Sequence, residues 1–410
     1  MRSRAGSHAI TVLMLLAIWP ATAQTPAGEP FTVNTTTDGF QTGPDVAAAP
    51  DGVFAVVWQD EVQDGDGWGL YARWFDATGE ALTGEVQVNR LTAGDQLHPQ
   101  IDSDGQGNFV IAWLDLTFGV RARRFDGVGM ALGDELAVTP PGPGPADQSV
   151  SANAAGSFVV TWLRPDLSNR VVEARRYGAD GLPLGKPFTV STFPQFLWLD
   201  GTEVELLDDL SFVVAWSDGE EVSARLYDSN GSPAGAEFQV SQGYPYSSFS
   251  SYVDVGSEAS GRFRVVWTTD VNLLEVTTMT RTITGGGALG PLTDLDLRSP
   301  EYDVSGFSMT RGGEFVVTQV SYWPRTFQGT RFDANHNPLS QFEVAGDADD
   351  SLGGANVAHQ SADSQEFVVV WAENPPGGFV PDIRARCFSP RIFSDGFESG
   401  DTAAWSTTVP

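Results

Sequence analysis

The loop over residues 60–67, Asp-Glu-Val-Gln-Asp-Gly-Asp-Gly, is the most acidic in the chain. Alternating carboxylates and glycines can wrap a calcium ion, because a hard cation takes several oxygen ligands and glycine lets the loop bend around it. The loop lacks the bidentate glutamate that ends a helix-loop-helix calcium site. Calcium is the one cofactor that the sequence suggests, with Asp60, Asp64 and Asp66 as the expected ligands. The alternative is a solvated hairpin loop.

Aromatic residues beside prolines form a second group of candidates. Tyr244-Pro-Tyr246, Trp198 and Trp323 all lie in segments that depart from the pattern of the rest of the chain. Exposed aromatic rings can stack on sugars, so these four residues are the candidate ligand-binding residues. The alternative is that each ring packs its own loop onto the body of the protein.

Enzyme motifs are missing from the sequence. It contains no H-E-x-x-H zinc pattern, no G-x-S-x-G nucleophile elbow and no phosphate-binding loop around its only lysine, Lys186. We therefore name no catalytic residue and expect a non-catalytic protein. A pair of carboxylates for glycoside hydrolysis can still be assembled from distant parts of a chain. With 53 acidic residues, the sequence alone does not single out such a pair.

The elements that position these residues follow from an internal repeat, F-x-[VI]-x-W, which returns about every 50 residues. Its copies begin at Phe54, Phe109, Phe158, Phe212, Phe263 and Phe367, and a copy without the tryptophan begins at Phe315. Behind each copy come a second strand with a turn and then a short F-x-V element, and a less regular strand precedes each phenylalanine. Each repeat therefore predicts four short strands, with no helical periodicity.

Seven such units predict an all-β, seven-bladed β-propeller of four-stranded blades. The first F-x-V element, residues 31–34, precedes the first repeat and none follows the last. We expect this N-terminal strand to complete the seventh blade and close the ring, which removes an exposed sheet edge. An open β-solenoid array is the alternative. The predicted limits are a signal peptide over 1–23, a linker over 24–30, the propeller over 31–390 and a tail over 391–410.

An arginine recurs in the second strand of most repeats, two residues before its Phe or Tyr. The set is Arg73, Arg123, Arg175, Arg225, Arg281 and Arg386, with Thr330 in the sixth repeat. A residue that recurs in nearly every blade is expected to have a structural role within the blade. We therefore expect each arginine to brace its own blade, by pairing with an acidic neighbour or stacking on the repeated tryptophan. A ring of anion receptors is the alternative.

Phe158-Val-Val-Thr-Trp162, the segment from Tyr71 to Gly79, and Glu237-Phe-Gln-Val240 carry a family resemblance. They resemble the F-V-V-x-W, R-F-D-x-x-G and E-F-x-V-N repeat of exported bacterial adhesin-like proteins. The resemblance implies a secreted, non-catalytic role and brings no ligand with it. The tail segment D-G-F-E-S-G-D-T-A-A-W resembles a C-terminal segment of exported proteobacterial proteins. That likeness implies a sorting signal, and the alternative is a cap packed on the last blade.

Asp102-Ser-Asp104-Gly105 resembles part of the calcium loops of integrin-type propellers. Those loops need further acidic positions, which Gln106 and Asn108 occupy in this chain. We expect a solvated turn there.

The chain has 410 residues and a formal charge of −30. A surface this acidic repels the phosphate backbone of nucleic acids and anionic lipid. Neither nucleic acid nor a membrane surface is therefore an expected partner. Residues 1–23 have the positive start, short apolar core and Ala-Thr-Ala cleavage pattern of a secretory signal, and the apolar core is too short to span a bilayer. Cys387 is the only cysteine, and we expect it to be buried on a strand.

These observations predict a secreted, extracellular or cell-surface propeller that acts as a monomeric binding or surface-interaction module. Its expected partner is an extracellular polysaccharide or an envelope protein, with calcium as an aid. Two alternatives stay open. One is a glycan-active enzyme with carboxylates at the mouth of the propeller channel, and the other is a purely structural envelope component.

Overall fold

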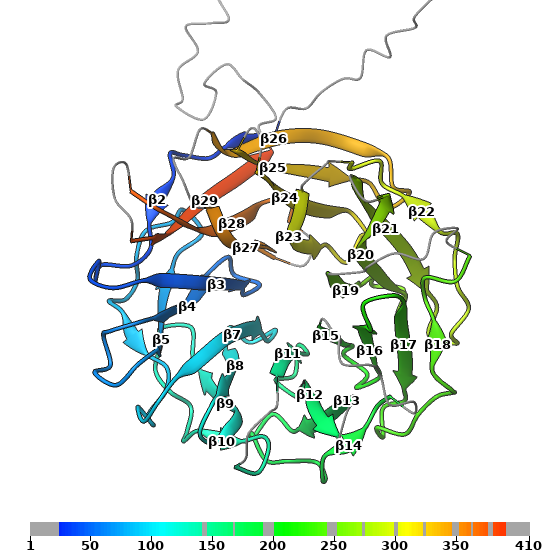
Figure 1. The fold of residues 1–410 in the computed structure, drawn as a ribbon, viewed down its shortest axis with the longest axis horizontal. Coiled ribbons are helices and arrows are strands. Elements are labelled where there is room, and N and C mark those ends of the chain that lie inside the picture. The colour runs from blue at the N-terminus through cyan, green and yellow to red at the C-terminus, as the bar shows by residue number, and fades with distance from the viewer. Residues whose placement is uncertain are drawn as a thin grey trace, which may run out of the picture.

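The computed structural model describes residues 24–141, 146–166, 169–191, 201–243, 252–272, 275–298, 302–322, 325–346, 352–361, 364–375 and 380–390. The structure is all-β over these ranges, and its strands form seven antiparallel sheets around a central axis (Figure 1). The seven-bladed β-propeller expected from the repeat is therefore confirmed. None of the described residues forms a helix that is long and apolar enough to cross a membrane.

Each blade begins with an inner strand, next to the ring axis. The inner strands are β3 (Gln41–Ala48), β7 (Gln96–Ser103), β11 (Ala146–Ala152), β15 (Thr202–Leu206), β19 (Val253–Ser257), β23 (Tyr302–Met309) and β27 (Leu352–His359). The second strands carry the repeated phenylalanine. They are β4 (Phe54–Asp60), β8 (Phe109–Asp115), β12 (Phe158–Asp166), β16 (Phe212–Ser217), β20 (Phe263–Asn272), β24 (Phe315–Tyr322) and β28 (Phe367–Glu373).

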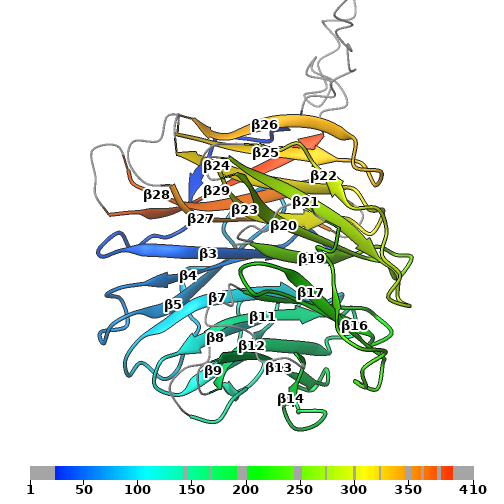
Figure 2. The same ribbon diagram turned by 45° about the vertical axis from the view of Figure 1, so that its right-hand side comes forward.

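The two remaining strands of each blade lie toward the outside. The third strands are β5 (Gly69–Phe75), β9 (Gly119–Phe125), β13 (Asn169–Tyr177), β17 (Val222–Tyr227), β21 (Glu275–Ile283), β25 (Arg325–Phe332) and β29 (Asp382–Pro390). The outer strands are β6 (Val86–Gln87), β10 (Leu136–Ala137), β14 (Phe188–Thr189), β18 (Phe238–Gln239), β22 (Thr293–Asp294) and the longer β26 (Pro338–Gly346). In the turned view of Figure 2, the inner strands β27, β3, β7 and β11 follow one another, as expected for neighbouring blades.

The repeated phenylalanine is the centre of each blade's packing. Phe54 faces Phe75 across β4 and β5, and their rings stack with centroids 5.2 Å apart. The repeated tryptophans, such as Trp58, are buried as well. Apolar residues of neighbouring blades share one core: Phe54 of the first blade belongs to the same cluster as Val368 of the last. The blades therefore stabilise one another through their faces, because each second strand is apolar on both sides.

The ring closes through the N-terminal strand, as predicted. Residues Phe31–Thr32 form β2, which pairs antiparallel with β29 of the last blade. A second short strand, β1 (Gln24–Pro26), pairs with the other end of β29, within a segment that the sequence suggested as a linker. Both pairings occupy the outer edge of the last blade and so cover backbone groups that would otherwise be exposed. Figure 1 shows β2 and β29 side by side.

The repeated arginines brace their own blades, as predicted, and also the preceding blades, which the sequence did not predict. Within the first blade, Arg73 Nε donates to the backbone carbonyl of Thr83 at 3.0 Å. Arg73 Nη1 donates to the backbone carbonyl of Val33, which follows β2, at 2.8 Å. The same contact to the preceding blade is made by Arg123 to Val88, Arg175 to Val138, Arg225 to Val190, Arg281 to Val240 and Arg386 to Val344. Each guanidinium except that of Arg281 also lies over the ring two residues further on, which shares its strand face. The expectation that they stack on the repeated tryptophan is wrong.

The seam between the fifth and sixth blades differs from the others. The sixth blade has Gln319 in place of the tryptophan and Thr330 in place of the arginine. Another arginine, Arg264 of β20, is completely buried there, with its guanidinium 4.7 Å from the centre of the Phe315 ring. An internal arginine thus fills an interface where the repeated residues are lost.

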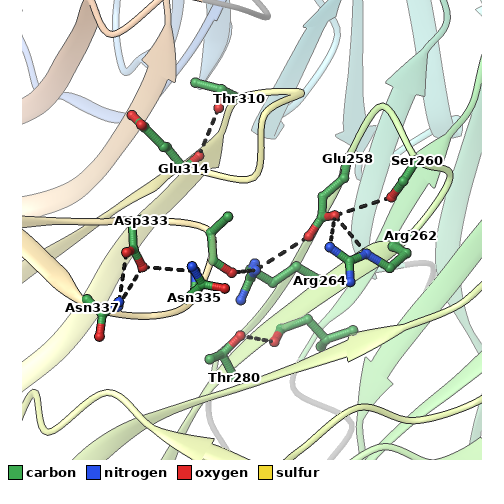
Figure 3. A network of polar contacts seen from close by, with 12 residues as sticks. Glu258, Ser260, Arg262, Arg264, Thr280, Thr310, Glu314, Asp333, Asn335 and Asn337 are labelled. Atoms are coloured by element: carbon green, nitrogen blue, oxygen red, sulfur yellow. Dashed lines mark hydrogen bonds and ion pairs between the residues drawn. The ribbon is translucent and has the colours of Figure 1, made fainter.

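Arg264 belongs to a polar network that reaches from the fifth blade to the sixth (Figure 3). Its Nη2 donates to the backbone carbonyl of Ala334 at 3.1 Å and lies 3.5 Å from Glu258 Oε1. Glu258 is buried too and accepts two further hydrogen bonds from Arg262, at 2.8 and 2.5 Å. Burial lowers the pKa of Arg264, and the neighbouring carboxyl group of Glu258 opposes that effect.

Candidate functional site

A cavity of about 900 Å³ lies between the inner strands of all seven blades. Side chains alternate between the two faces of a strand, so every second residue of an inner strand can point toward the ring axis. We call this cavity the central channel. Each inner strand pairs along one edge with the second strand of its blade and contacts the inner strands of the neighbouring blades, so the groups that line the channel are held on a rigid scaffold.

Five carboxyl groups on the inner strands line the central channel in two tiers. The first tier consists of Asp45, Glu203 and Asp254, each paired with the residue three places after its blade's repeated phenylalanine. The second tier consists of Asp102 and Glu205, each paired with the residue directly after that phenylalanine. Equal register places each tier at one level of the channel. The same two levels carry Gln100, Ser149, Ser151, Ser308 and Asn356 in other blades.

Two of the three aspartates of these tiers, Asp45 and Asp102, join neighbouring blades. Asp45 Oδ2 accepts a hydrogen bond from the backbone N–H of Ile101 in the second blade, at 2.8 Å. Its Oδ1 accepts one from Asn356 Nδ2 of the last blade, at 2.5 Å. Asp102 Oδ2 accepts one from the backbone N–H of Ala152 in the third blade, at 2.7 Å. The channel carboxyls therefore serve the packing of the ring as well as its lining.

The glutamates make the same kind of contact through serine hydroxyls. Ser149 Oγ of the third blade donates to Glu203 Oε2 at 2.7 Å, and Ser257 Oγ of the fifth donates to Glu205 Oε1 at 2.5 Å. Tyr252 Oη donates to Asp254 Oδ2 at 2.8 Å. All five carboxyl groups thus have a polar partner in the protein.

The channel raises the pKa of every one of these carboxyl groups, chiefly because burial disfavours their charged form. The pKa of Asp102 rises to about 6, those of Asp45 and Asp254 to about 7, and that of Glu205 to about 8. Burial and the neighbouring charge of Asp254 raise the pKa of Glu203 well above its ordinary value. At neutral pH the central channel therefore holds protonated and ionised carboxyl groups together.

Ser308 and His359 form a second polar pair in the channel lining, with Ser308 Oγ 2.8 Å from His359 Nδ1. Such a contact is the geometry of a serine nucleophile and its base. Burial, and then the positive charge of Arg331, lower the pKa of His359 to about 3. An imidazole of that pKa is a poor proton acceptor at neutral pH, so this pair is not an activated nucleophile. The carboxyl groups are the acid–base groups of the channel.

Asp60, a predicted calcium ligand, lies at the end of β4 and is completely buried. Its Oδ1 accepts hydrogen bonds from the backbone N–H groups of Val62 and Gln63, at 2.9 and 2.8 Å. Its Oδ2 accepts one from Gln41 Nε2 at 2.9 Å. The carboxylate of Asp60 therefore shapes the loop that follows it.

Asp64 and Asp66, the other two predicted ligands, lie on the same loop nearer to solvent. Asp64 accepts hydrogen bonds from the backbone N–H of Asp66, at 3.1 Å, and from Asn89 Nδ2, at 3.3 Å. Asp66 Oδ2 accepts one from the backbone N–H of Gly94, at 3.4 Å. No three His, Cys, Asp or Glu side chains of the described ranges are grouped so that they could hold a metal ion. Calcium binding by this loop stays a prediction.

The candidate aromatic residues Trp198, Tyr244, Tyr246 and Trp323 all lie outside the described residues, as do the predicted signal peptide and the tail. Their roles stay predictions.

The two acids of the motif Asp102-Ser-Asp104-Gly105 lie in different places. Asp104 accepts hydrogen bonds from the backbone N–H groups of Gln106 and Asn108, both at 2.8 Å, and so makes the expected turn. Asp102 of that motif faces the channel instead.

Sequence reasoning missed the channel carboxyls as a group. The signal that could have found them is the polar–apolar alternation ahead of each repeated phenylalanine, as in Glu203-Val-Glu205 and Asp254-Val. That alternation predicts a strand with one polar face. Four of these strands, β3, β7, β15 and β19, contribute one or two of the five acids each, and only the closed ring shows that their polar faces meet.

The chain matches no family model and no curated protein. Among solved structures it is similar to a protein of unknown function from Dyadobacter fermentans, with a TM-score of 0.53 and 9% identity, over 90% of this chain and 99% of that one. It is also similar to the β-propeller domain of the Trilobed protease from Pyrococcus furiosus, with a TM-score of 0.49 and 9% identity, over 84% and 94% of the two chains. A third similar structure is prolyl oligopeptidase B from Galerina marginata, with a TM-score of 0.49 and 11% identity, over 82% of this chain and 48% of that one. The first of these likenesses supports the propeller fold alone.

Proposed function

We propose that this protein is a secreted, non-catalytic binding module that takes sugar hydroxyls of an extracellular polysaccharide into its central channel. The observation that carries the proposal is the channel lining, where two tiers of carboxyl groups alternate with serine and amide side chains on rigid strands. A sugar hydroxyl donates and accepts hydrogen bonds at once. A mixture of protonated and ionised carboxyls, hydroxyls and amides offers partners for both roles.

The acidic loop and the aromatic residues belong to the same proposal. Asp64 and Asp66 are proposed as ligands for a calcium ion that assists binding, with Asp60 shaping their loop. Tyr244, Tyr246, Trp198 and Trp323 are proposed as rings that stack on sugar faces outside the channel. The high negative charge of the chain agrees with a neutral ligand, because an anionic polysaccharide would be repelled.

The test is a glycan array probed with the purified protein, first with calcium and then with a chelator. The channel variant carries Glu203→Ala and Asp254→Ala, which remove the hydrogen-bonding groups, and the matched control carries Glu80→Ala and Glu343→Ala, two exposed carboxyls on the outside of the ring. We expect the wild type and the control to bind and the channel variant to lose binding. Loss of wild-type binding in chelator, repeated by Asp64→Asn with Asp66→Asn, assigns the calcium role.

Two results overturn the proposal. Binding that the channel variant keeps would move the site away from the channel. If no glycan binds in either condition, a polysaccharide ligand is ruled out. An envelope protein as partner, or a structural role for the ring, would then remain.

A second candidate function, a glycan-active enzyme, is favoured by the neighbouring acids Glu203 and Asp254. Glycoside hydrolysis uses one protonated carboxyl group as acid and one ionised carboxylate as base or nucleophile. Burial and then the charge of Asp254 raise the pKa of Glu203, which favours this division of roles. An assay for newly formed reducing ends separates the two functions, since a binding module retains the glycan unchanged. Release of reducing ends by the wild type and not by Glu203→Gln would establish the enzyme.

A further inference from the structure

The carboxyl tiers lie where blades meet, so their charge acts on the ring as a whole. Asp45 links the first blade to the second and the last, and Asp102 links the second to the third. Glu203 receives its hydrogen bond from the third blade, and Glu205 receives its own from the fifth. A change in the charge of these groups therefore alters five hydrogen bonds between neighbouring blades.

The groups that face Glu203 and Asp254 are almost all acidic or neutral. Across the channel and beside it lie Asp45 of β3, Asp102 of β7, Asp147 of β11, Glu205 of β15, Tyr252 before β19 and His359 of β27. The described β23 side chains in the lining, Phe307, Ser308 and Met309, carry no charge.

Positive charge near the described part of the lining is already engaged. Arg311 pairs with Asp208 at 3.0 Å, and the arginines beside Glu258 pair with that residue. The imidazole of His359 stays neutral above its lowered pKa of about 3. The remaining ionisable groups of the described lining are His98 and the acidic Asp104, Asp208, Asp209 and Glu258. Ionisation of the five carboxyls would thus place several negative charges in one partly buried cavity in which acidic groups outnumber basic ones, which is unfavourable.

We propose that protonation of the channel carboxyl groups regulates this protein: the protonated channel is free of repulsion between its carboxyl groups and accepts a neutral sugar, and the ionised channel destabilises the seven-bladed ring through that repulsion and releases the sugar. Each hydrogen bond between blades favours the ionised carboxylate that accepts it, so the repulsion acts against these contacts. The release of sugar rests on the proposed function. The effect of protons on the ring does not, because it follows from the gathering of five carboxyl groups in one cavity.

The direction follows from linkage between proton binding and folding. The folded state holds protons that the unfolded chain gives up at ordinary carboxyl pKa values near 4, so protonation stabilises the ring fully below that pH. This stabilisation is lost as the pH rises through the folded pKa values of about 6 to 8. His359 has the opposite effect on stability below pH 6.5, because there the unfolded chain binds a proton that the folded chain does not bind.

The first experiment measures thermal unfolding of the full chain without ligand from pH 5 to pH 9. We expect the melting temperature of the wild type to fall over this range. In the variant with Glu205→Gln and Asp254→Asn we expect less than half of that fall, and in the control with Glu80→Gln and Glu343→Gln the whole of it. An equal fall in the wild type and the channel variant would overturn the proposal.

A second measurement on the wild type covers the case in which the channel variant does not fold. Infrared spectroscopy detects the carbonyl band of protonated carboxyl groups, which we expect to persist at pH 6 and to disappear by pH 9. Its absence at pH 6 would overturn the proposal.

A final comparison separates the two proposals. If the array identifies a glycan, its affinity is expected to be at least tenfold weaker at pH 8.5 than at pH 5.5, and an unchanged affinity overturns the regulation of binding. If no glycan binds at any pH, the proposed function fails. The unfolding experiment then still decides the effect of protons on the ring.

Discussion

Arg73 Nη1 lies 2.8 Å from the backbone carbonyl oxygen of Val33 and donates a hydrogen bond to it. Val33 follows the N-terminal strand that completes the last blade, whereas Arg73 belongs to the third strand of the first blade. This one contact therefore joins the two ends of the ring. The same contact is made between the internal blades that keep the repeated arginine, so the closing seam is built like those seams.

Loss of Arg73 is expected to weaken the closing seam. The change Arg73→Gln removes a charge-assisted hydrogen bond and the stacking over Phe75, and we expect it to lower the free energy of unfolding by about 2 kcal/mol. Denaturant unfolding measures this value. The matched control is Arg90→Gln, which breaks an exposed ion pair with Asp134 and should cost less than about 1 kcal/mol. Equal losses for both variants would contradict the bracing role.

The buried pair at the fifth and sixth blades is expected to respond unequally to changes of its two members. Glu258→Gln leaves the guanidinium of Arg264 buried without its carboxylate, which typically costs about 3–5 kcal/mol. Arg264→Met removes the buried charge and keeps most of the volume, while Glu258 retains Arg262. We therefore expect a much smaller loss for Arg264→Met in denaturant unfolding. A larger loss for Arg264→Met than for Glu258→Gln would show that the hydrogen bond to Ala334 dominates.

His359 is expected to remain neutral far below the pH at which an exposed histidine is protonated. Burial lowers its pKa to about 3, so the folded state excludes a proton that the unfolded chain takes up below about pH 6.5. Its contribution to stability is therefore lost as the pH falls from 6.5 toward 3. Nuclear magnetic resonance of the ring protons should show no titration of His359 between pH 8 and pH 4.5, with His359→Gln assigning the signal. A midpoint near pH 6 would refute the burial of an uncharged ring.

Cys387 is expected to be unreactive in the folded protein. It is buried on β29 and its pKa is raised to about 12, chiefly by burial and then by the charges of Asp76 and Glu366. A thiol of this pKa forms almost no thiolate at neutral pH. An aromatic disulfide reagent at pH 8 should release no colour from native protein and one equivalent after unfolding in denaturant. Rapid labelling of the native protein would contradict the packing of the last blade.

The sequence alone determined the blade, the number of blades and the closing strand. These follow from local patterns: a strand that is apolar on both faces, turn residues at a fixed period, and one F-x-V element that precedes the first repeat. Phe54 opposite Phe75 is a product of that pattern, because a hairpin of fixed length places the two rings in register.

Only the tertiary structure decided which residues meet across the ring. The position of Arg73 in its strand predicts a contact within its own blade, which it makes with Thr83, but its contact with Val33 depends on how two blades pack face to face. Likewise Asp45, Glu203 and Asp254 are separated by one to four repeats in the sequence, and they share a tier only because the ring closes around a common axis. Their raised pKa values arise from the burial that closure creates. Local periodicity specifies a blade, whereas charge, burial and contact at the centre belong to the whole ring.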